Sequence, residues 1–411
     1  MSLLIRQARI LTLAGGAASR RGTALRDLGV LESGDVLLEG LRVAGVGRSL
    51  ESPPETPVIE TSGRVLIPGF VDCYTHACWA DDRLDEWEMK LRGVPYLEIL
   101  KQGGGIHSTV RGVRAASGKE LADNTLEQLQ TMLRAGTTTA EVKSGYGLST
   151  EAELKMLRAI GRAADRWPGT VIPTALLGHA IEGDAEAFVA RTIDETLPAV
   201  SRAFPGVAVD AFCESGAWSL DACVRLFERA RQLGHPVRVH ADQFNSLGMV
   251  AEAVRLGALS VDHLEATTGA DLTRLARSDT YGVILPCTGF HTDGRYARAR
   301  AFVDAGGALA LATNCNPGSA PTHSVPFAIA LAVRYCGLTP AEAIAAATVN
   351  AAALLGLRDR GTIESGQRAD LILLRHRDER MLAHELADSP VETVICGGRV
   401  VFEGRDEYPV S

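Results

Sequence analysis

The chain has 411 residues, of which 46% are hydrophobic, 22% are charged and 5% are aromatic, and its formal net charge is −8. This balance is that of a folded globular protein, and the length favours a large barrel with a smaller appendage. The acidic charge argues against nucleic acid as a partner, and no apolar stretch reaches the 18 residues of a membrane span, so we expect a cytoplasmic protein. The eight cysteines include no Cys-x-x-Cys pair, which fits reduced thiols.

Short strands with turn residues between them are predicted at both ends of the chain. They cover residues 3–5, 10–13, 35–38, 41–46, 369–374, 394–396 and 399–402. The pair Gly397-Gly398 separates the last two strands and is a good hairpin signal. Neither end has enough strands to bury a core alone. We therefore predict that residues 1–64 and 364–411 form one composite β-sandwich domain.

Between the two ends, short apolar runs alternate with helical patterns. Eight runs read as buried strands: 65–72, 137–142, 171–177, 207–212, 237–240, 259–263, 282–285 and 308–312. Segments between them, such as 151–164, 220–233 and 245–256, carry apolar residues at three- and four-residue spacing. Strand followed by helix, eight times over, predicts an α/β fold with a (β/α)8 TIM-type barrel over residues 65–363.

Polar residues at the carboxyl ends of these runs mark the candidate site, because the chemistry of such a barrel lies at that rim. Four of the ten histidines stand there: His76, His179, His240 and His263. The first run ends in Tyr74-Thr-His76, and side chains two apart on a strand point the same way. A strand that ends in His-x-His commonly holds two ligands of a catalytic metal. Here the first position is a tyrosine, and the four histidines together predict a functional site.

Several motifs resemble those of the imidazolonepropionase family within the amidohydrolase superfamily, whose members open a five-membered ring in histidine degradation at a mononuclear zinc or iron site. The motifs lie at 68–76 (Pro-Gly-Phe-Val-Asp-Cys-Tyr-Thr-His), 103–111, 141–147 (Glu-Val-Lys-Ser-Gly-Tyr-Gly), 239–243, 262–265 and 315–318. The resemblance extends over nearly the whole chain. It implies a small-molecule substrate with a carboxylate tail, and a homodimer.

The resemblance also assigns site residues by position. The family's metal ligands fall on Tyr74, His76, His240 and Asn314, where Tyr74 stands in place of histidine and Asn314 in place of aspartate. The positions that resemble the substrate contacts are Arg83 and Tyr96 for the carboxylate, and Tyr146, His179, Gln243 and Asn316 around the ring. His263 matches a position near the metal-bound water. An arginine suits a carboxylate because its fork donates two parallel hydrogen bonds.

The two departures at ligand positions weaken the expected metal cage. An asparagine amide cannot act as a base near neutral pH, and a tyrosine ligates only when its pKa of about 10 is strongly depressed. We therefore expect no metal, or only weakly bound zinc or iron. A third departure is Cys287, where the family usually has glycine. Either its thiol is a nucleophile whose pKa is lowered by His263 or a neighbouring base, or Cys287 is simply a small residue in place of glycine.

The sequence favours a hydrolase that opens a five-membered imidazolone-type ring, such as imidazolone, hydantoin or thiohydantoin propionate, in histidine or thiohistidine degradation. The catalytic candidates are His263, Gln243, Asn314 and Cys287. Three alternatives stay open: a metal-independent isomerase or proton-transfer enzyme on the same ligands, a cysteine-dependent enzyme, and a non-catalytic ligand binder.

Overall fold

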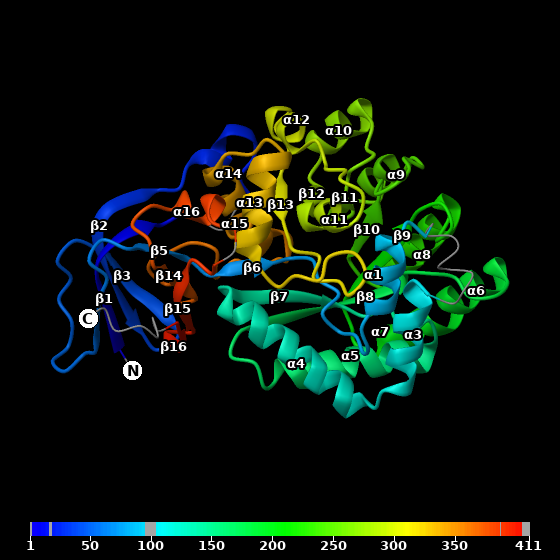
Figure 1. The fold of residues 1–411 in the computed structure, drawn as a ribbon, viewed down its shortest axis with the longest axis horizontal. Coiled ribbons are helices and arrows are strands. Elements are labelled where there is room, and N and C mark those ends of the chain that lie inside the picture. Colours follow the sequence, from blue (N-terminus) through cyan, green and yellow to red (C-terminus); the bar gives the residue numbers. More distant parts are fainter. Residues whose placement is uncertain (1, 16–18, 95–103, 387, 405–411) are drawn as a thin grey trace.

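The computed structural model describes the chain except residues 1, 16–18, 95–103, 387 and 405–411. Its strands form two separate eight-stranded sheets. One sheet is parallel and makes the barrel at the right of Figure 1, and the other is mixed and lies at the left. The predicted α/β class, with a TIM-type barrel and a smaller β domain built from both ends of the chain, is confirmed.

The barrel strands follow one another in chain order, each paired in parallel with the next. They are β6 (Phe70–Asp72), β7 (Thr137–Lys143), β8 (Thr170–Gly178), β9 (Ala208–Cys213), β10 (Val237–Ala241), β11 (Ser260–His263), β12 (Tyr281–Ile284) and β13 (Leu309–Leu311). Just past the first and last strands, Thr75 and Asn314 form a parallel bridge. This bridge brings the residues that follow β6 beside those that follow β13, which nearly closes the barrel.

The first predicted run, 65–72, is divided between the two sheets. β5 (Val65–Pro68) pairs with strands of the terminal sheet, whereas β6 belongs to the barrel. Gly69 separates them, and a Cβ at this position would lie 2.1 Å from Thr138 Oγ1, so only glycine fits so close to β7. The chain thus passes from one sheet to the other within a single apolar run.

The terminal sheet has the strand order β16-β15-β14-β5-β1-β2-β3, with β4 also paired to β1. Its strands are β1 (Ser2–Leu11), β2 (Val30–Glu39), β3 (Arg42–Gly47), β4 (Val58–Glu60), β5, β14 (Leu371–Leu374), β15 (Val391–Cys396) and β16 (Arg399–Glu403). The run predicted at 3–5 and the first half of the run at 10–13 form one strand, which ends at Leu11 and has a register shift near Gln7, whose φ is +53°. The domain boundaries at 64/65 and 363/364 stay predictions.

The helices that connect the barrel strands are capped as expected for amphipathic surface helices. Ser117 and Glu120 form a capping box at the start of α4, and Ser219 caps α8. The helices are α1 (Leu84–Leu91), α3 (Ile106–Ala115), α4 (Gly118–Arg134), α5 (Thr150–Ala164), α6 (Ala185–Arg191), α7 (Leu197–Ala203), α8 (Leu220–Gln232), α9 (Met249–Arg255), α10 (Gly269–Ala276), α11 (Pro286–His291), α12 (Ala299–Asp304), α13 (Val325–Tyr335), α14 (Pro340–Ala346), α15 (Val349–Leu354) and α16 (Met381–His384). A 3-10 turn, η1 (Gly22–Arg26), and a π turn, η2 (Thr192–Thr196), complete them.

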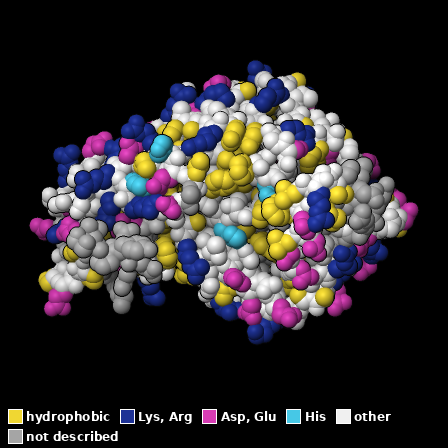
Figure 2. Space-filling model, in the orientation of Figure 1, with side chains coloured by type: hydrophobic (Ala, Val, Ile, Leu, Met, Phe, Trp, Pro, Cys, Tyr) yellow, Lys and Arg dark blue, Asp and Glu magenta, His cyan; other side chains and the backbone are white. Residues whose placement is uncertain are grey.

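Two of the three helices predicted between strands match closely, and the third is shorter. The segment 245–256 becomes helical only at α9, because Gly248 stands before it with a φ of +86°. Among the helices of the described residues, none is long and apolar enough to cross a bilayer. On the face shown in Figure 2, Lys and Arg side chains are interspersed with Asp and Glu.

Candidate active site

Four buried histidines meet at the carboxyl rim of the barrel. His76 follows β6, His179 follows β8, His240 lies in β10 and His263 ends β11. The ring centroid of His76 is 5.1 Å from that of His179 and 5.3 Å from that of His240, and His240 is 5.8 Å from His263. The structure thus brings together imidazoles that are far apart in the sequence, each at or near a strand end.

His76 and His240 point their Nε2 atoms at each other across 3.3 Å. Asp210 accepts a hydrogen bond from His240 Nδ1 at 3.0 Å, so the Nε2 lone pair of His240 faces the site. Burial lowers the pKa of His240 to about 3 and that of His76 well below its ordinary value, so both imidazoles are neutral. Two nitrogens at 2.0–2.1 Å from one tetrahedral ion would be about 3.3–3.4 Å apart. The pair therefore has the spacing and protonation of two ligands of a single ion.

Asn314 supplies a third buried ligand atom. Its Nδ2 donates to Thr288 Oγ1 at 2.8 Å and to Ser319 Oγ at 3.0 Å, which fixes the orientation of the amide. Its Oδ1 is buried without a hydrogen-bond partner among the described residues. The backbone carbonyl of Asn314 accepts from His76 N at 3.2 Å, so the residue lies directly beside the histidine pair. An unpaired buried carbonyl oxygen costs free energy unless a ligand satisfies it.

Tyr74 is fully buried, and its ring centroid lies 4.8 Å from that of His240 and 5.9 Å from that of His263. The hydroxyl is 3.4 Å from His263 Nε2, and the other nitrogen of His263 is 3.3 Å from Glu265 Oε1. Burial, aided by the nearby Asp210 carboxylate, raises the pKa of Tyr74 well above its usual range. The phenol therefore stays protonated, and a protonated phenol is a hydrogen-bond donor rather than an anionic metal ligand.

A buried ion network lies behind Tyr74 inside the barrel. Lys143 Nζ lies 2.8 Å from Glu141 Oε1, 2.9 Å from Asp210 Oδ2 and 4.2 Å from the Tyr74 ring centroid. Arg238 pairs with Asp262 at 3.1 Å. Burial alone would raise the pKa of Asp210, but the adjacent His240 and Lys143 lower it, so this carboxylate stays ionised and keeps hold of His240. The network fixes the orientation of His240 from below.

Arg83 lies at the start of α1, nine-tenths buried, and its guanidinium packs on the loop after β13. Its Nε donates to Glu86 Oε2 at 2.5 Å and its Nη1 lies 3.3 Å from Thr109 Oγ1. A Cβ placed on Gly318 would lie 2.8 Å from Arg83 Cζ, so the arginine rests on that glycine. Glu86 and Gly318 together hold the cation at the barrel mouth.

Tyr146 and His179 form one wall of the site. Their ring centroids are 5.0 Å apart, and His179 Nδ1 donates to the Gly145 carbonyl at 2.9 Å. Burial lowers the pKa of His179 to about 4, so its Nε2 is an acceptor. A side-chain hydrogen bond joins Tyr146 to Asn316.

The remaining predicted residues are less closely tied to the histidines. Gln243 is half-buried on the loop after β10. Cys287 lies in α11 within the hydrophobic core, where burial raises the pKa of its thiol, which is the opposite of what activates a thiol nucleophile. Tyr96 lies outside the described residues.

Sequence reasoning passed over Asp210, Arg238 and Glu153, which lie just behind the site residues. The first two are charged residues inside apolar strands, at Val209-Asp210-Ala211 and Val237-Arg238-Val239. A charged side chain within a buried strand needs a partner of opposite charge. This rule could have identified Asp210 and Arg238 from the sequence.

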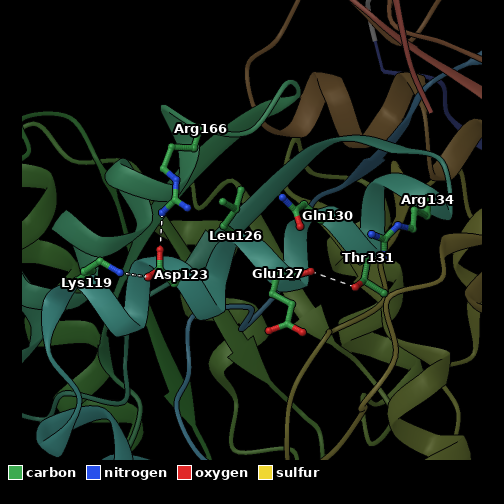
Figure 3. Close-up of a pocket in the computed structure, with 8 residues that line it drawn as sticks. All are labelled: Lys119, Asp123, Leu126, Glu127, Gln130, Thr131, Arg134 and Arg166. Atoms are coloured by element: carbon green, nitrogen blue, oxygen red, sulfur yellow. Dashed lines mark hydrogen bonds and ion pairs between the residues drawn. The ribbon is translucent and has the colours of Figure 1, made fainter.

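A hollow of about 530 Å³ lies on the outer surface of α4, away from the strand ends. Figure 3 shows that Asp123 there is paired with Lys119 and Arg166, at 2.7 Å and 2.5 Å. These charges satisfy one another at the exposed surface. We therefore take the barrel rim, and not this hollow, as the candidate active site.

The sequence profile of the amidohydrolase family matches residues 65–401. The imidazolonepropionase of Herpetosiphon aurantiacus is 43% identical over 402 residues, which cover 94% of each chain. The chain therefore belongs to the amidohydrolase family, as an imidazolonepropionase-like member. Its membership supports a hydrolase that acts on carbon–nitrogen bonds.

Solved structures with the same fold include a mutant of atrazine chlorohydrolase from Arthrobacter aurescens complexed with zinc and atraton. It has a TM-score of 0.70 at 17% identity and covers 98% of this chain and 95% of its own. An adenosine deaminase from Xanthomonas campestris with bound zinc has a TM-score of 0.68 at 20% identity, covering 97% and 92%. At these identities the likeness shows the fold.

The expectation of no metal, or only weakly bound zinc or iron, is wrong. Within the described part of the chain, Asp210, His240 and Asp262 bring ligand atoms within 4.8 Å of one another, a group that can hold an ion. The expectation rested on the two changed ligand positions alone. It did not consider that Asp210 orients His240, or that Asn314 Oδ1 is buried without a hydrogen-bond partner among the described residues.

Proposed function

We propose that this protein is a metal-dependent hydrolase that opens a five-membered imidazolone-type ring carrying a propionate. The observation that carries the proposal is the His76–His240 pair, neutral and 3.3 Å apart, on the same rim as Arg83, Tyr146 and His179. The 43% identity to a protein named imidazolonepropionase supports the same ring class.

The residues that would hold the ion are His76, His240 and Asn314, through two imidazole nitrogens and one amide oxygen. Asp210 and Asp262, which form with His240 the group that can hold an ion, are available as further ligands, although Lys143 and Arg238 lie against them. Three protein ligands with an open position is the usual composition of a catalytic zinc site. When bound, such an ion supplies a Lewis acid that polarises a carbonyl and lowers the pKa of water.

Arg83 at the barrel mouth and the wall formed by Tyr146 and His179 are proposed to hold the substrate ring in place. Arg83 is proposed to bind the propionate carboxylate, and Tyr96 is retained as its second contact by position. Tyr146, His179 and Asn316 are proposed to contact the ring, with Gln243 at the edge of the site. A rigidly held ring raises the effective concentration of the reacting groups.

The proton transfers fall to His263. With Glu265 accepting from Nδ1, its Nε2 takes a proton from the attacking water, and the Tyr74 oxygen 3.4 Å away is placed to accept a hydrogen bond from the resulting Nε2–H. Water adds to the ring carbonyl carbon, the bond from this carbon to the ring nitrogen breaks, and His263 returns the proton to that nitrogen. One water is consumed, and the product is an open chain with a new carboxylate.

The route through a Cys287 thiolate is set aside, because the thiol is buried in the apolar core and its pKa is raised. The small-molecule substrate with a carboxylate tail is part of this proposal. The expectations of a cytoplasmic homodimer without a nucleic-acid partner stay predictions.

The test is direct. The purified, zinc-loaded protein is incubated with imidazolone, hydantoin and thiohydantoin propionates in water enriched in oxygen-18, and the products are weighed by mass spectrometry. We expect one ring to gain a single water with the heavy oxygen in the new carboxylate. Unchanged masses for all three rings would contradict the proposed function.

A further inference from the structure

Glu153 is a buried carboxylate that no step described so far uses. It lies in the first turn of α5, 2% exposed, and turns back toward the loop that follows β7. Its Oε1 accepts from Gly147 N at 2.7 Å and from Leu148 N at 2.9 Å, and its Oε2 accepts from Gly145 N at 2.9 Å. Three charge-assisted hydrogen bonds to one carboxylate are far more than a surface helix needs.

The same loop is held from its other side. Arg114 Nε donates to the Gly147 carbonyl at 2.8 Å, and its Nη2 lies 3.3 Å from the Leu148 carbonyl. Gly145 has a φ of +110°, and a Cβ on Gly147 would lie 2.6 Å from Glu153 N. The backbone of residues 145–148 is therefore fixed through its amides and carbonyls, in a conformation that requires both glycines.

This loop carries two groups of the ring-binding wall. Tyr146 lies within it, and the Gly145 carbonyl accepts from His179 Nδ1 at 2.9 Å. That contact places the proton of His179 on Nδ1 and leaves Nε2 as an acceptor. The amide that binds Glu153 and the carbonyl that binds His179 belong to the same residue, Gly145.

We propose that Glu153 is a positioning residue, which holds the 145–148 loop so that His179 is fixed as the Nδ1–H tautomer and Tyr146 faces the ring. The inference rests on the proposed function, since it assigns a task to the wall that binds the ring. Glu153 acts entirely through the loop, because its carboxylate is occupied by three backbone amides and has no need to touch substrate.

The wall formed by Tyr146 and His179 also has a defined arrangement of hydrogen-bond donors and acceptors. Asn316 Oδ1 already accepts from Gly318 N at 2.8 Å and Ser319 N at 3.2 Å, so its amide nitrogen is the group that binds the Tyr146 oxygen. The Tyr146 hydroxyl proton is then free to be donated. One donor beside one acceptor matches a ring edge that carries an N–H next to a C=O, as in a cyclic amide or ureide.

Glu153→Gln is the smallest change that tests the proposal. Whichever way the new amide is turned, its NH2 group faces at least one backbone N–H of the loop. Loss of one charge-assisted hydrogen bond corresponds to about a tenfold or larger effect. We expect the KM for the ring substrate to rise about tenfold while kcat changes by less than about threefold. Glu151→Gln, an exposed position in the same helical turn, is the matched control and should leave both unchanged.

A second readout separates positioning from general loss of structure. With ¹⁵N-labelled histidine, the ligand-free protein should show His179 as a single Nδ1–H tautomer, and Glu153→Gln should show a mixture. Combined with His179→Gln, Glu153→Gln should cost less affinity than it does as a single change, because part of its effect acts through the His179 imidazole. Should Glu153→Gln not fold, Arg114→Met frees the same loop from its exposed side and should shift the tautomer in the same direction.

The proposal is overturned if the wild type opens a ring but the His179 tautomer and KM are unchanged in both Glu153→Gln and Arg114→Met. Additive losses in the Glu153→Gln, His179→Gln pair would also overturn it. A wild type that opens none of the rings would instead contradict the proposed function, and the tautomer measurement, which needs no substrate, would still decide the role of Glu153.

Discussion

At the scale of single residues, Tyr74 decides how the metal site differs from a strand that ends in His-x-His. Its hydroxyl faces His263 Nε2 and its ring covers the Lys143 ammonium, and both contacts suit a neutral phenol. In the proposed function the tyrosine belongs to the proton-transfer side of the site, while His76, His240 and Asn314 form the ligand side. Removing the single hydroxyl oxygen of Tyr74 tests this division.

Tyr74→Phe removes only the hydroxyl. We expect the zinc content per chain to stay the same, because no ligand is lost, and kcat to fall about tenfold, because His263 loses a hydrogen bond at its catalytic nitrogen. Elemental analysis and steady-state kinetics measure the two effects. Loss of zinc with the hydroxyl would show instead that the phenolate is a ligand.

Gly318→Ala tests the carboxylate site without touching a charge. Its backbone conformation admits alanine, but the new methyl group would lie 2.8 Å from Arg83 Cζ and displace the guanidinium. Affinity for the propionate ring should fall by about 1.5–3 kcal/mol, as for loss of a hydrogen bond to a charged group. Calorimetry with the propionate ring and with its methyl ester measures this effect. Equal losses for acid and ester would argue that Arg83 does not bind the carboxylate.

At the scale of elements, the buried histidines make stability depend on pH. Burial lowers the pKa of His179 from its ordinary 6.5 to about 4. Between these values the unfolded chain binds a proton that the folded chain does not, so the free energy of unfolding falls as the pH falls from 6.5 to 4. Above pH 6.5 the contribution of His179 to the free energy of unfolding no longer changes with pH.

His179→Gln should abolish this part of the pH dependence. From about pH 7 to about pH 5, the wild type should lose about 2 kcal/mol more of its free energy of unfolding than the variant does. Urea denaturation of chelator-treated protein at both pH values gives the difference. Parallel losses in the two proteins would mean that His179 is protonated in the folded state or carries a partner at Nε2.

The strands and their ends followed from the sequence, because apolar runs of strand length and a polar residue at each end are local patterns. The division of 65–72 did not, since it depends on how closely Gly69 approaches Thr138 in the neighbouring strand. Asp210, Arg238 and Glu153 were missed for the same reason. Their roles are set by partners 24 and 30 residues away or by backbone amides across a loop, and no local pattern encodes those contacts.

At the scale of the whole molecule, Arg360 joins the barrel to the terminal sheet. Its Nη1 donates to Thr139 Oγ1 at 3.1 Å and to Thr170 Oγ1 at 2.7 Å, on β7 and β8. The same atom lies 3.5 Å from Asp370, the residue before β14. The side chain is 8% exposed, so its charge is satisfied by these contacts and little by water.

Arg360→Met should lower the free energy of unfolding by about 1–3 kcal/mol, because it removes the donor to the Thr139 and Thr170 hydroxyls and one of the two cations beside Asp370, the other being Arg368 at 2.9 Å. Arg358→Met, at an exposed position two residues earlier, should change it by less than about 0.5 kcal/mol. Thermal unfolding of the three proteins compares them. Equal melting temperatures would show that the barrel and the sheet hold together without this contact.

The central claim is that ring opening depends on one metal ion held beside His76 and His240, and a zinc titration of chelator-stripped protein tests it most directly. Turnover of the ring substrate is followed as zinc is added back. The account predicts almost no turnover without zinc, a rise that ends at one equivalent per chain, and no such rise in His76→Ala. Full turnover in the stripped wild type, or an equal response from His76→Ala, would contradict it.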